Sequence, residues 1–528
     1  MRRSRVVPAA AASAAALGVA YLLLPKMGSD LSAQVARADF FAAHGAALVD
    51  LRWYGGIHPL GYSLVSPPVM AILGVRGAGA LALVASAAAF AALLVRTGVP
   101  RPLLGSLVGV LAIVGNLVSG RVTYGLGVAF GLAALLALTM PTSVSPGRRR
   151  LRVGLAVAAA LLASATSPVA GLFVGLTGAA LLLARRYGDG LLLGVGAAVP
   201  LPVTGLLFGE GGWMNISRTD TVRAVLTSLL VAALVAYRPV RVGALLSAGG
   251  VLLASVVHTP VGLNATRLVV MFALPLLAAA ARLPDPVARR VPQGLRRGGV
   301  AGVALATLLA AVCWWQPPVV PADLQSIGDP TSDPAYFAPL RAELARRGLT
   351  GRVEVPPTRN YWEAALLGDV PLARGWLRQA DIDRNPLFFG EVPGAEGTGV
   401  PLTAATYRDW LADNAVQYVA VPDAPLSWVG RPEAQLVTDG LPYLRPVWQD
   451  AHWRLFAFTE AQPLVGQPAT LVGQTASTVT FTTRSDEQVL IRVRYSRWLR
   501  TTAGVTLRPA DGWTLAHPPG PGTFTLTG

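Results

Sequence analysis

Three carboxylates stand in one polar stretch near the start of a chain whose first part is poor in acids. Asp30, Asp39 and Asp50 lie within residues 28–68, while residues 1–316 contain only seven Asp and Glu in all. A carboxylate can take a proton from an acceptor hydroxyl, or hold a divalent metal that binds a phosphate leaving group. Asp30 and Asp39 are the predicted catalytic residues, Asp30 first. The alternative is a solvated loop acid or a cap of a following helix.

The same stretch contains the run Arg52-Trp53-Tyr54-Gly-Gly-Ile-His58. Trp53 and Tyr54 can stack on a sugar ring, and they can equally form an aromatic belt at the membrane interface. His58 can bind a metal or shuttle a proton, although a lone histidine more often has a structural role. Arg52, Trp53, Tyr54 and His58 are therefore predicted to bind substrate.

Two further arginines, Arg121 and Arg267, each directly precede an apolar segment. A guanidinium at the outer boundary of a membrane can bind a lipid phosphate through two parallel hydrogen bonds. The alternative is a side chain that extends from the membrane edge to reach the headgroups. Both are predicted to bind the phosphate of a substrate. Glu210 and Asp220, in another external loop, are weaker candidates.

The composition identifies a membrane protein. The 528 residues are 53% hydrophobic and 14% charged, whereas a soluble domain has about 25% charged residues. Residues 1–316 hold 26 basic and 7 acidic residues, a net charge of +19, and residues 317–528 hold 18 and 21, a net charge of −3. A basic excess confined to the apolar part reflects membrane topology, so we expect no nucleic-acid partner.

Eleven apolar stretches are long enough, or nearly so, to span a bilayer. They lie at 6–24, 77–95, 103–119, 123–140, 153–166, 169–184, 190–208, 222–237, 242–257, 267–281 and 299–315. Arginines cluster at alternate ends of these stretches, which predicts a cytoplasmic N-terminus, with residues 28–68 and everything after Trp315 outside. The segment 63–75 is predicted to be an interfacial helix or the start of the second span.

Residues 317–528 are predicted to form two extracytoplasmic domains. Residues 317–465 alternate helical and strand patterns and predict a small α/β domain, in which Thr403 is a candidate N-cap of a helix. Residues 466–528 contain short alternating runs separated by Gly and Pro, which predict a small β-sandwich. The predicted strands are 352–355, 416–421, 478–483, 489–495, 514–516 and 523–526, and the predicted helices are 336–349 and 403–414.

Several common chemistries lack their usual motifs. The sequence has no Walker A motif, no dinucleotide-binding GxGxxG within a βαβ unit, no HExxH and no GxSxG with triad partners. The single cysteine, Cys313, lies in an apolar stretch and forms no disulfide framework. Transporters usually place charged residues in mid-membrane; here the apolar stretches are nearly free of charge. This distribution favours chemistry at a membrane surface.

This layout resembles the GT-C class of polytopic membrane glycosyltransferases. Asp30 in G-S-D-L-S-A-Q stands where that class has an acid in its first external loop. The runs W-Y-G-G-I-H-P-L-G-Y-S and I-R-V-R-Y-S-R-W-L-R-T-T-A-G look like those of bacterial GT-C-like proteins of the YfhO type. The resemblance implies a polyprenyl-phosphate sugar donor and an extracytoplasmic C-terminal part. The loop lacks the adjacent acid pair found in the class, which leaves dependence on a divalent metal, Mg²⁺ or Mn²⁺, open.

The predicted protein is thus a multi-pass protein of a bacterial plasma membrane, with about eleven helices in residues 1–316 and the two external domains. Its predicted function is transfer of a sugar from a polyprenyl-phosphate lipid to a cell-envelope glycan or other acceptor on the outer face. Two alternatives stay open. A transporter or flippase of a lipid-linked substrate would have two pseudo-symmetric halves, and a non-catalytic envelope assembly protein would tolerate loss of the acids in the first loop.

Overall fold

The computed structural model describes residues 3–141, 145–282, 300–502 and 504–528. Contacts divide the chain into two compact units. Unit 1 comprises residues 1–28, 62–207 and 214–327, and unit 2 comprises residues 29–61, 208–213 and 328–528. Unit 2 therefore contains part of the first long loop and a short internal segment, as well as the C-terminal part of the chain.

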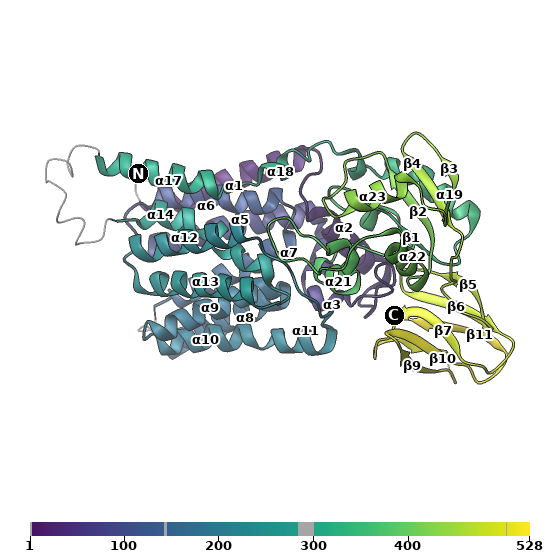
Figure 1. The fold of residues 1–528 in the computed structure, drawn as a ribbon. Helices are drawn as coiled ribbons and strands as arrows, with labels where there is room; N and C mark the ends of the chain where they lie inside the picture. Colours follow the sequence, from purple (N-terminus) through teal and green to yellow (C-terminus); the bar gives the residue numbers. More distant parts are fainter. Residues whose placement is uncertain (1–2, 142–144, 283–299, 503) are drawn as a thin grey trace. The chain divides into compact units, whose positions relative to one another are not determined.

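Unit 1 is helical, and each of the eleven predicted stretches forms helix within it (Figure 1). Its longer helices are α1 (Val6–Leu23), α5 (Val75–Arg96), α6 (Pro102–Val118), α7 (Val122–Leu138), α8 (Pro146–Thr166), α9 (Pro168–Leu183), α10 (Tyr187–Ala198), α11 (Pro200–Phe208, which ends one residue into unit 2), α12 (Arg218–Leu234), α13 (Arg238–Val256), α14 (Arg267–Ala280) and α17 (Val300–Trp315). The short elements are η1 (Arg3–Arg5), α4 (Ser66–Leu73), η2 (Gly262–Thr266) and α18 (Pro321–Leu324).

Among the described residues, five helical spans are long and apolar enough to cross a membrane: Arg3–Leu23, Val75–Arg96, Tyr187–Phe208, Arg238–Val256 and Gly262–Ala280. Four shorter apolar helices accompany them, at Pro102–Val118, Val122–Leu138, Pro168–Leu183 and Gly302–Trp315. The chain is a multi-pass membrane protein, and the number of crossings stays a prediction.

Local residue chemistry accounts for several helix boundaries in unit 1. Pro200 divides the predicted span 190–208 into α10 and α11, because proline has no backbone N–H to donate. Ser167 separates α8 from α9, and its hydroxyl caps α9 by accepting from the N–H of Ala170. Gly74, at a φ of 72°, ends α4 and makes it a separate helix before α5.

The first long loop contains a helix that the sequence analysis did not predict. Helix α2 (Leu31–His44) occupies a third of the predicted loop, followed by the short α3 (Pro59–Tyr62). The first turn of α2 is buried all round, because the four consecutive residues 31–34 are fully inaccessible to solvent. The apolar spacing in this segment is short and interrupted by Arg37 and Asp39, so the periodic signal for a helix is weak.

The α/β part of unit 2 has a four-stranded sheet in the order β1-β2-β4-β3. Strands β1 (Arg352–Glu354) and β2 (Val416–Pro422) are parallel, and β4 (Trp453–Phe458) and β3 (Leu444–Gln449) add antiparallel neighbours. Its helices are η3 (Pro330–Ser332), α19 (Pro334–Arg347), α20 (Glu363–Leu366), α21 (Arg378–Arg384), η4 (Pro386–Phe389), α22 (Ala404–Asp413) and α23 (Gly430–Asp439). Thr403 caps α22 in a capping box with Thr406, as its position predicts.

The end of the chain forms two antiparallel sheets on a common core. One has the order β7-β10-β9 and the other the order β5-β6-β11-β8. The strands are β5 (Thr470–Gln474), β6 (Thr478–Thr483), β7 (Val489–Arg494), β8 (Arg500–Thr501), β9 (Thr506–Ala510), β10 (Trp513–His517) and β11 (Gly522–Thr527). Phe481 and Ile491, one from each sheet, share this core with Val49 and Leu51 of the first loop.

Candidate active site

Asp30 stands at the head of α2, in the position of its N-cap, and its side chain makes no capping hydrogen bond. The residue is 8% exposed. Asp39 lies later in α2 and is exposed. The two predicted catalytic carboxylates therefore differ in environment. Asp30 is largely shielded from solvent and can be approached from fewer directions than Asp39.

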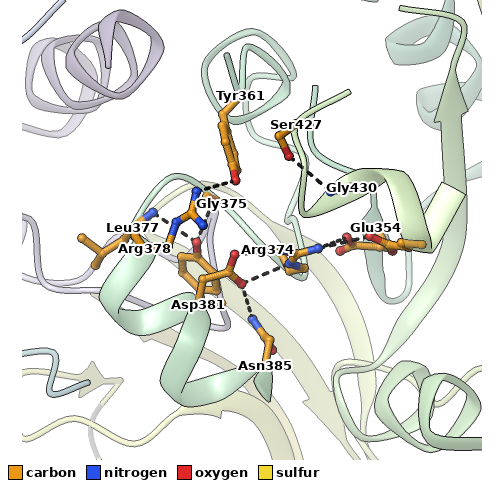
Figure 2. A network of polar contacts seen from close by, with 12 residues as sticks. Glu354, Tyr361, Arg374, Gly375, Leu377, Arg378, Asp381, Asn385, Ser427 and Gly430 are labelled. Carbon is orange, nitrogen blue, oxygen red and sulfur yellow. Dashed lines mark hydrogen bonds and ion pairs between the residues drawn. The ribbon is translucent and has the colours of Figure 1, made fainter. Parts of the chain in front are cut away.

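The fold brings the aromatic residue Trp376 to Ser29, the residue before Asp30. Its indole N–H donates to the carbonyl oxygen of Ser29 at 3.1 Å, and its ring is only partly buried. Tyr361 packs against it edge-on, with ring centroids 6.1 Å apart. The hydroxyl of Tyr361 accepts a hydrogen bond of 3.2 Å from Arg378 (Figure 2). Trp376, Tyr361 and Arg378 lie more than 300 residues from Asp30 in the sequence, so spacing could not reveal them.

Tyr54 fixes the backbone on both sides of Trp376. Its hydroxyl donates to the carbonyl of Gly375 and accepts from the N–H of Leu377 at 3.1 Å. Tyr54 is 2% exposed, and burial together with the charge of Asp381 raises the pKa of its phenol well above the usual value. The phenol therefore stays protonated and can make both hydrogen bonds. Within unit 2 the ring of Tyr54 is buried and holds this segment in place, and stacking of a sugar on it stays a prediction.

Arg374, next to Gly375, is held by three buried carboxylates (Figure 2). It lies 2.9 Å from Asp381, 3.1 Å from Glu433 and 3.7 Å from Glu354. One guanidinium cannot neutralise three carboxylates, and burial of the charged forms raises the pKa of Glu433 to about 7 and that of Glu354 well above its usual value. This arrangement anchors the segment that carries Trp376.

Arg52 and Trp53 are also buried within unit 2. Arg52 forms a 2.7 Å ion pair with Asp50 and donates to the carbonyl of Ala36. Burial opposes the charge of Arg52, but Asp50 outweighs it and raises the pKa of the guanidinium. Trp53 is fully buried, and its indole donates to the carbonyl of Ala364 at 3.1 Å. Within unit 2 these contacts hold the loop in place, and substrate binding by either residue stays a prediction.

His58 contacts Glu210, the acid of the other external loop. Its Nδ1 lies 3.0 Å from Glu210, its Nε2 lies 2.8 Å from the hydroxyl of Ser496, and its backbone N–H donates to the same carboxylate. Arg384 binds the other oxygen of Glu210 at 2.6 Å. Burial by itself would raise the pKa of Glu210. The hydrogen bonds from His58 and the charge of Arg384 have the larger combined effect, so the pKa lies below its usual value. Asp220 lies in the first turn of α12 in unit 1, where its carboxylate accepts a hydrogen bond from the hydroxyl of Ser217.

Arg121 and Arg267 approach a common residue in unit 1. They stand at the starts of α7 and α14, and the guanidinium of Arg267 lies 5.5 Å from the ring centroid of Tyr124. The charges of both arginines act on the Tyr124 hydroxyl. Tyr124 is 3% exposed, and its hydroxyl has no hydrogen-bond partner among the described residues. Two cations and an unpaired hydroxyl form a donor set suited to an oxyanion.

Asp323 is a buried carboxylate of unit 1 that the sequence analysis did not single out. Its Oδ2 accepts from the hydroxyl of Ser119 at 2.5 Å, two residues before Arg121, and Asp323 is 4% exposed. Gly28 packs closely against the same turn. Any other residue would place its Cβ 2.3 Å from the carbonyl oxygen of Val118, which is too close. These contacts fix the turn that leads into Arg121.

Within the described parts of the chain, no three His, Cys, Asp or Glu side chains gather in a way that could hold a metal ion. Mg²⁺ often binds through one or two carboxylates together with substrate phosphates, so dependence on Mg²⁺ or Mn²⁺ stays a prediction.

Comparison with known proteins finds similarity only at the level of solved structures. No protein-family model and no curated protein matches the sequence. The arabinofuranosyltransferase AftD from Mycobacteria is similar at 19% identity with a TM-score of 0.48, over 86% of this chain and 40% of AftD. ArnT from Cupriavidus metallidurans, crystallised with undecaprenyl phosphate, is similar at 14% identity with a TM-score of 0.44, over 87% of this chain and 99% of ArnT.

Both of these neighbours are GT-C glycosyltransferases, the class that the sequence resembles. This chain spans about two fifths of the length of AftD. Likenesses this remote identify neither a donor nor an acceptor for the chain.

Proposed function

We propose that this protein is a membrane glycosyltransferase that moves a sugar from a polyprenyl-phosphate lipid to a cell-envelope acceptor on the outer face of the membrane. One observation carries the proposal. The hydrogen bond from Trp376 to Ser29 holds a partly exposed aromatic ring one residue away from Asp30. The ring can provide a stacking surface for a sugar, and the carboxylate of the next residue along the loop can act as a base for a hydroxyl.

In the proposed reaction, an acceptor hydroxyl attacks the anomeric carbon of the donor. The new bond joins the acceptor oxygen to that carbon, the bond from the carbon to the phosphate oxygen breaks, and polyprenyl phosphate leaves with the electron pair. Asp30 takes the hydroxyl proton and releases it to water. The reaction needs no nucleotide, which agrees with the lack of nucleotide-binding motifs and with a site on the outer face.

Arg121, Arg267 and Tyr124 are the proposed phosphate-binding residues. The phosphate gains negative charge as its bond to the sugar breaks, and guanidinium groups stabilise that charge. The unpaired hydroxyl of Tyr124 can donate a third hydrogen bond. The external domains of residues 317–528 are proposed to hold the acceptor, and Asp39, Arg52 and His58 remain secondary candidates.

The test is sugar transfer by purified full-length protein, using a panel of polyprenyl-phosphate sugars, with donor binding measured in parallel. Asp30→Asn is expected to bind donor normally and to lose transfer by about 100-fold or more, because general-base catalysis contributes about 10²–10⁴. Arg267→Gln is expected to weaken donor binding by about 10- to 100-fold, because a hydrogen bond between charged groups is worth about 1.5–3 kcal/mol.

Arg218→Gln is the matched control, because Arg218 also begins a helix and is exposed. It should leave binding and transfer unchanged. Transfer that persists in Asp30→Asn would remove Asp30 as the base. Failure of the wild type to transfer any sugar of the panel would overturn the enzyme proposal and leave the transporter and assembly alternatives. Adding EDTA to the wild-type assay tests dependence on a divalent metal.

A further inference from the structure

A cluster of arginines lies in unit 2 apart from the residues assigned to transfer. Arg352 of β1 and Arg494 of β7 both lie beside Trp513 of β10, with guanidinium carbons 5.4 Å and 4.3 Å from the ring centroid. Arg492, two residues before Arg494 on the same face of β7, contributes its carbonyl to Arg352. Residues 317–528 carry a net negative charge, so a local group of three arginines is unexpected there.

The positive charges of this cluster are poorly compensated. Arg352 is 1% exposed, and among the described residues its guanidinium donates to the neutral carbonyl groups of Asn414 and Arg492 alone. Arg492 donates to another carbonyl, that of Pro463. The Nε atoms of all three arginines are buried and have no hydrogen-bond partner among the described residues. Arg494 makes no side-chain hydrogen bond to any of those residues.

The nearby carboxylates do not form ion pairs with the cluster. Asp413 is exposed and accepts from the indole of Trp513 at 3.2 Å. The charges of Asp413 and Asp383 favour the charged form of Arg494, whereas Arg384 adds further positive charge. Burial, with repulsion from Arg494 and Arg492, lowers the pKa of Arg352 to about 9. Burial, with repulsion from Arg384, lowers the pKa of Arg494 to about 10. All remain charged at neutral pH, and an added anion would relieve the repulsion.

The backbone of the first loop contacts this cluster at Gly55. Gly55 accepts at its carbonyl from the N–H of Arg494 at 2.7 Å. A Cβ at Gly55 would lie 2.8 Å from the Trp513 ring and 3.1 Å from Arg352. The absence of a side chain at Gly55 therefore allows the loop that carries Tyr54 to reach the arginines.

We infer that Arg494, Arg492 and Arg352 form a binding site for an oxyanion of the phosphate type, separate from the proposed transfer site. Arg494 and Arg492 are half-buried and form the accessible part. Arg352 is buried and contributes positive charge to the site. The anion has two possible sources, a soluble phosphate or the headgroup of an anionic lipid, which offer the same chemistry.

The test compares thermal unfolding of the full-length protein in neutral detergent with sodium phosphate or with sodium chloride at equal ionic strength. Phosphate stabilises most proteins because it is excluded from their surface. The quantity that tests the inference is therefore the difference in Tm gain between the wild type and a variant. The wild type is expected to gain about 3 °C more in Tm than Arg494→Gln. Arg508→Gln, an exposed arginine of β9, should gain as much as the wild type.

Neutral nanodiscs with and without phosphatidylglycerol identify the source. If phosphatidylglycerol raises the Tm of the wild type more than that of Arg494→Gln, the anion is a lipid headgroup. If only phosphate does so, the anion is soluble. If Arg494→Gln does not fold, Arg492→Gln replaces it in the same comparison. Equal gains in the wild type, the cluster variant and Arg508→Gln in both media would overturn the inference. The result does not depend on sugar transfer, so it stands or falls separately from the proposed function.

Discussion

Glu363 is a carboxyl group that the fold keeps protonated. It is 4% exposed and accepts a hydrogen bond from the hydroxyl of Thr358. Burial raises its pKa from 4.5 to about 8. Between these two values the folded protein holds a proton that the unfolded chain has released. The free energy of unfolding therefore decreases as the pH rises through this range.

Glu363→Gln is expected to reduce this pH dependence, because the amide keeps the shape and has no charge to bury. Each pKa unit corresponds to about 1.4 kcal/mol, so the variant should be clearly more stable than the wild type above pH 8. The measurement is thermal unfolding of the full-length protein, followed by tryptophan fluorescence from pH 5 to pH 9. Glu391→Gln, at an exposed position, is the control. Parallel pH profiles for the wild type and Glu363→Gln would contradict the prediction.

At the scale of single residues, the sequence could indicate the types of side chain and could not indicate their partners. Asp50 and Arg52 are two residues apart, and nothing in that spacing shows that they bind each other in a buried pair. Trp376 could not be chosen among twelve tryptophans without the fold that brings it to Ser29. Arg121 and Arg267 could be selected because arginine is disfavoured at the outer boundary of a membrane.

At the scale of elements, the turn between Asp50 and Ile57 determines how the first loop packs. These two residues form an antiparallel bridge, and Tyr54, Gly55 and Gly56 between them all have positive φ. Gly55 is the critical position, because it combines a φ of 76° with close contact to Trp513 and Arg352.

Gly55→Ala is expected to destabilise unit 2 more than Gly45→Ala. Both positions have positive φ, where an alanine strains the backbone. A Cβ at Gly45 has nothing within 4 Å, whereas Gly55→Ala adds an overpacking cost of about 1–3 kcal/mol. Thermal unfolding of the two variants measures the difference. Equal losses of Tm would show that the contact with Trp513 can relax.

Apolar periodicity predicted the long helices well, and alternating patterns predicted strands such as β2, β6 and β7. The elements that were missed include α2, α23 and the edge strand β9. Strand β9 is short and turns only Leu507 and Pro509 to one face, and in α2 polar residues are among the buried ones. Their structure depends on contacts with distant parts of the chain.

At the scale of the whole molecule, the distribution of arginines predicts which side of the membrane each part occupies. Cys313 is the only cysteine, so Cys313→Ala provides a background for single labels. In intact cells, Asp486→Cys is expected to react with a membrane-impermeant maleimide. Arg149→Cys should react only after permeabilisation. Both positions are exposed, so access to the reagent depends on topology alone. The opposite labelling pattern would exclude a reaction site on the outer face.

Unit 2 is assembled from three separate stretches of chain, and this has a consequence during biosynthesis. Residues 29–61 leave the ribosome long before residues 328–528 are made, yet Val49, Leu51 and Trp53 pack against that later part. The segment must remain unfolded while the intervening helices enter the membrane, since contacts so distant in sequence form late. A nascent chain stopped before residue 328 would therefore present exposed apolar side chains to proteases and chaperones, which gives the cell a means to recognise incomplete copies.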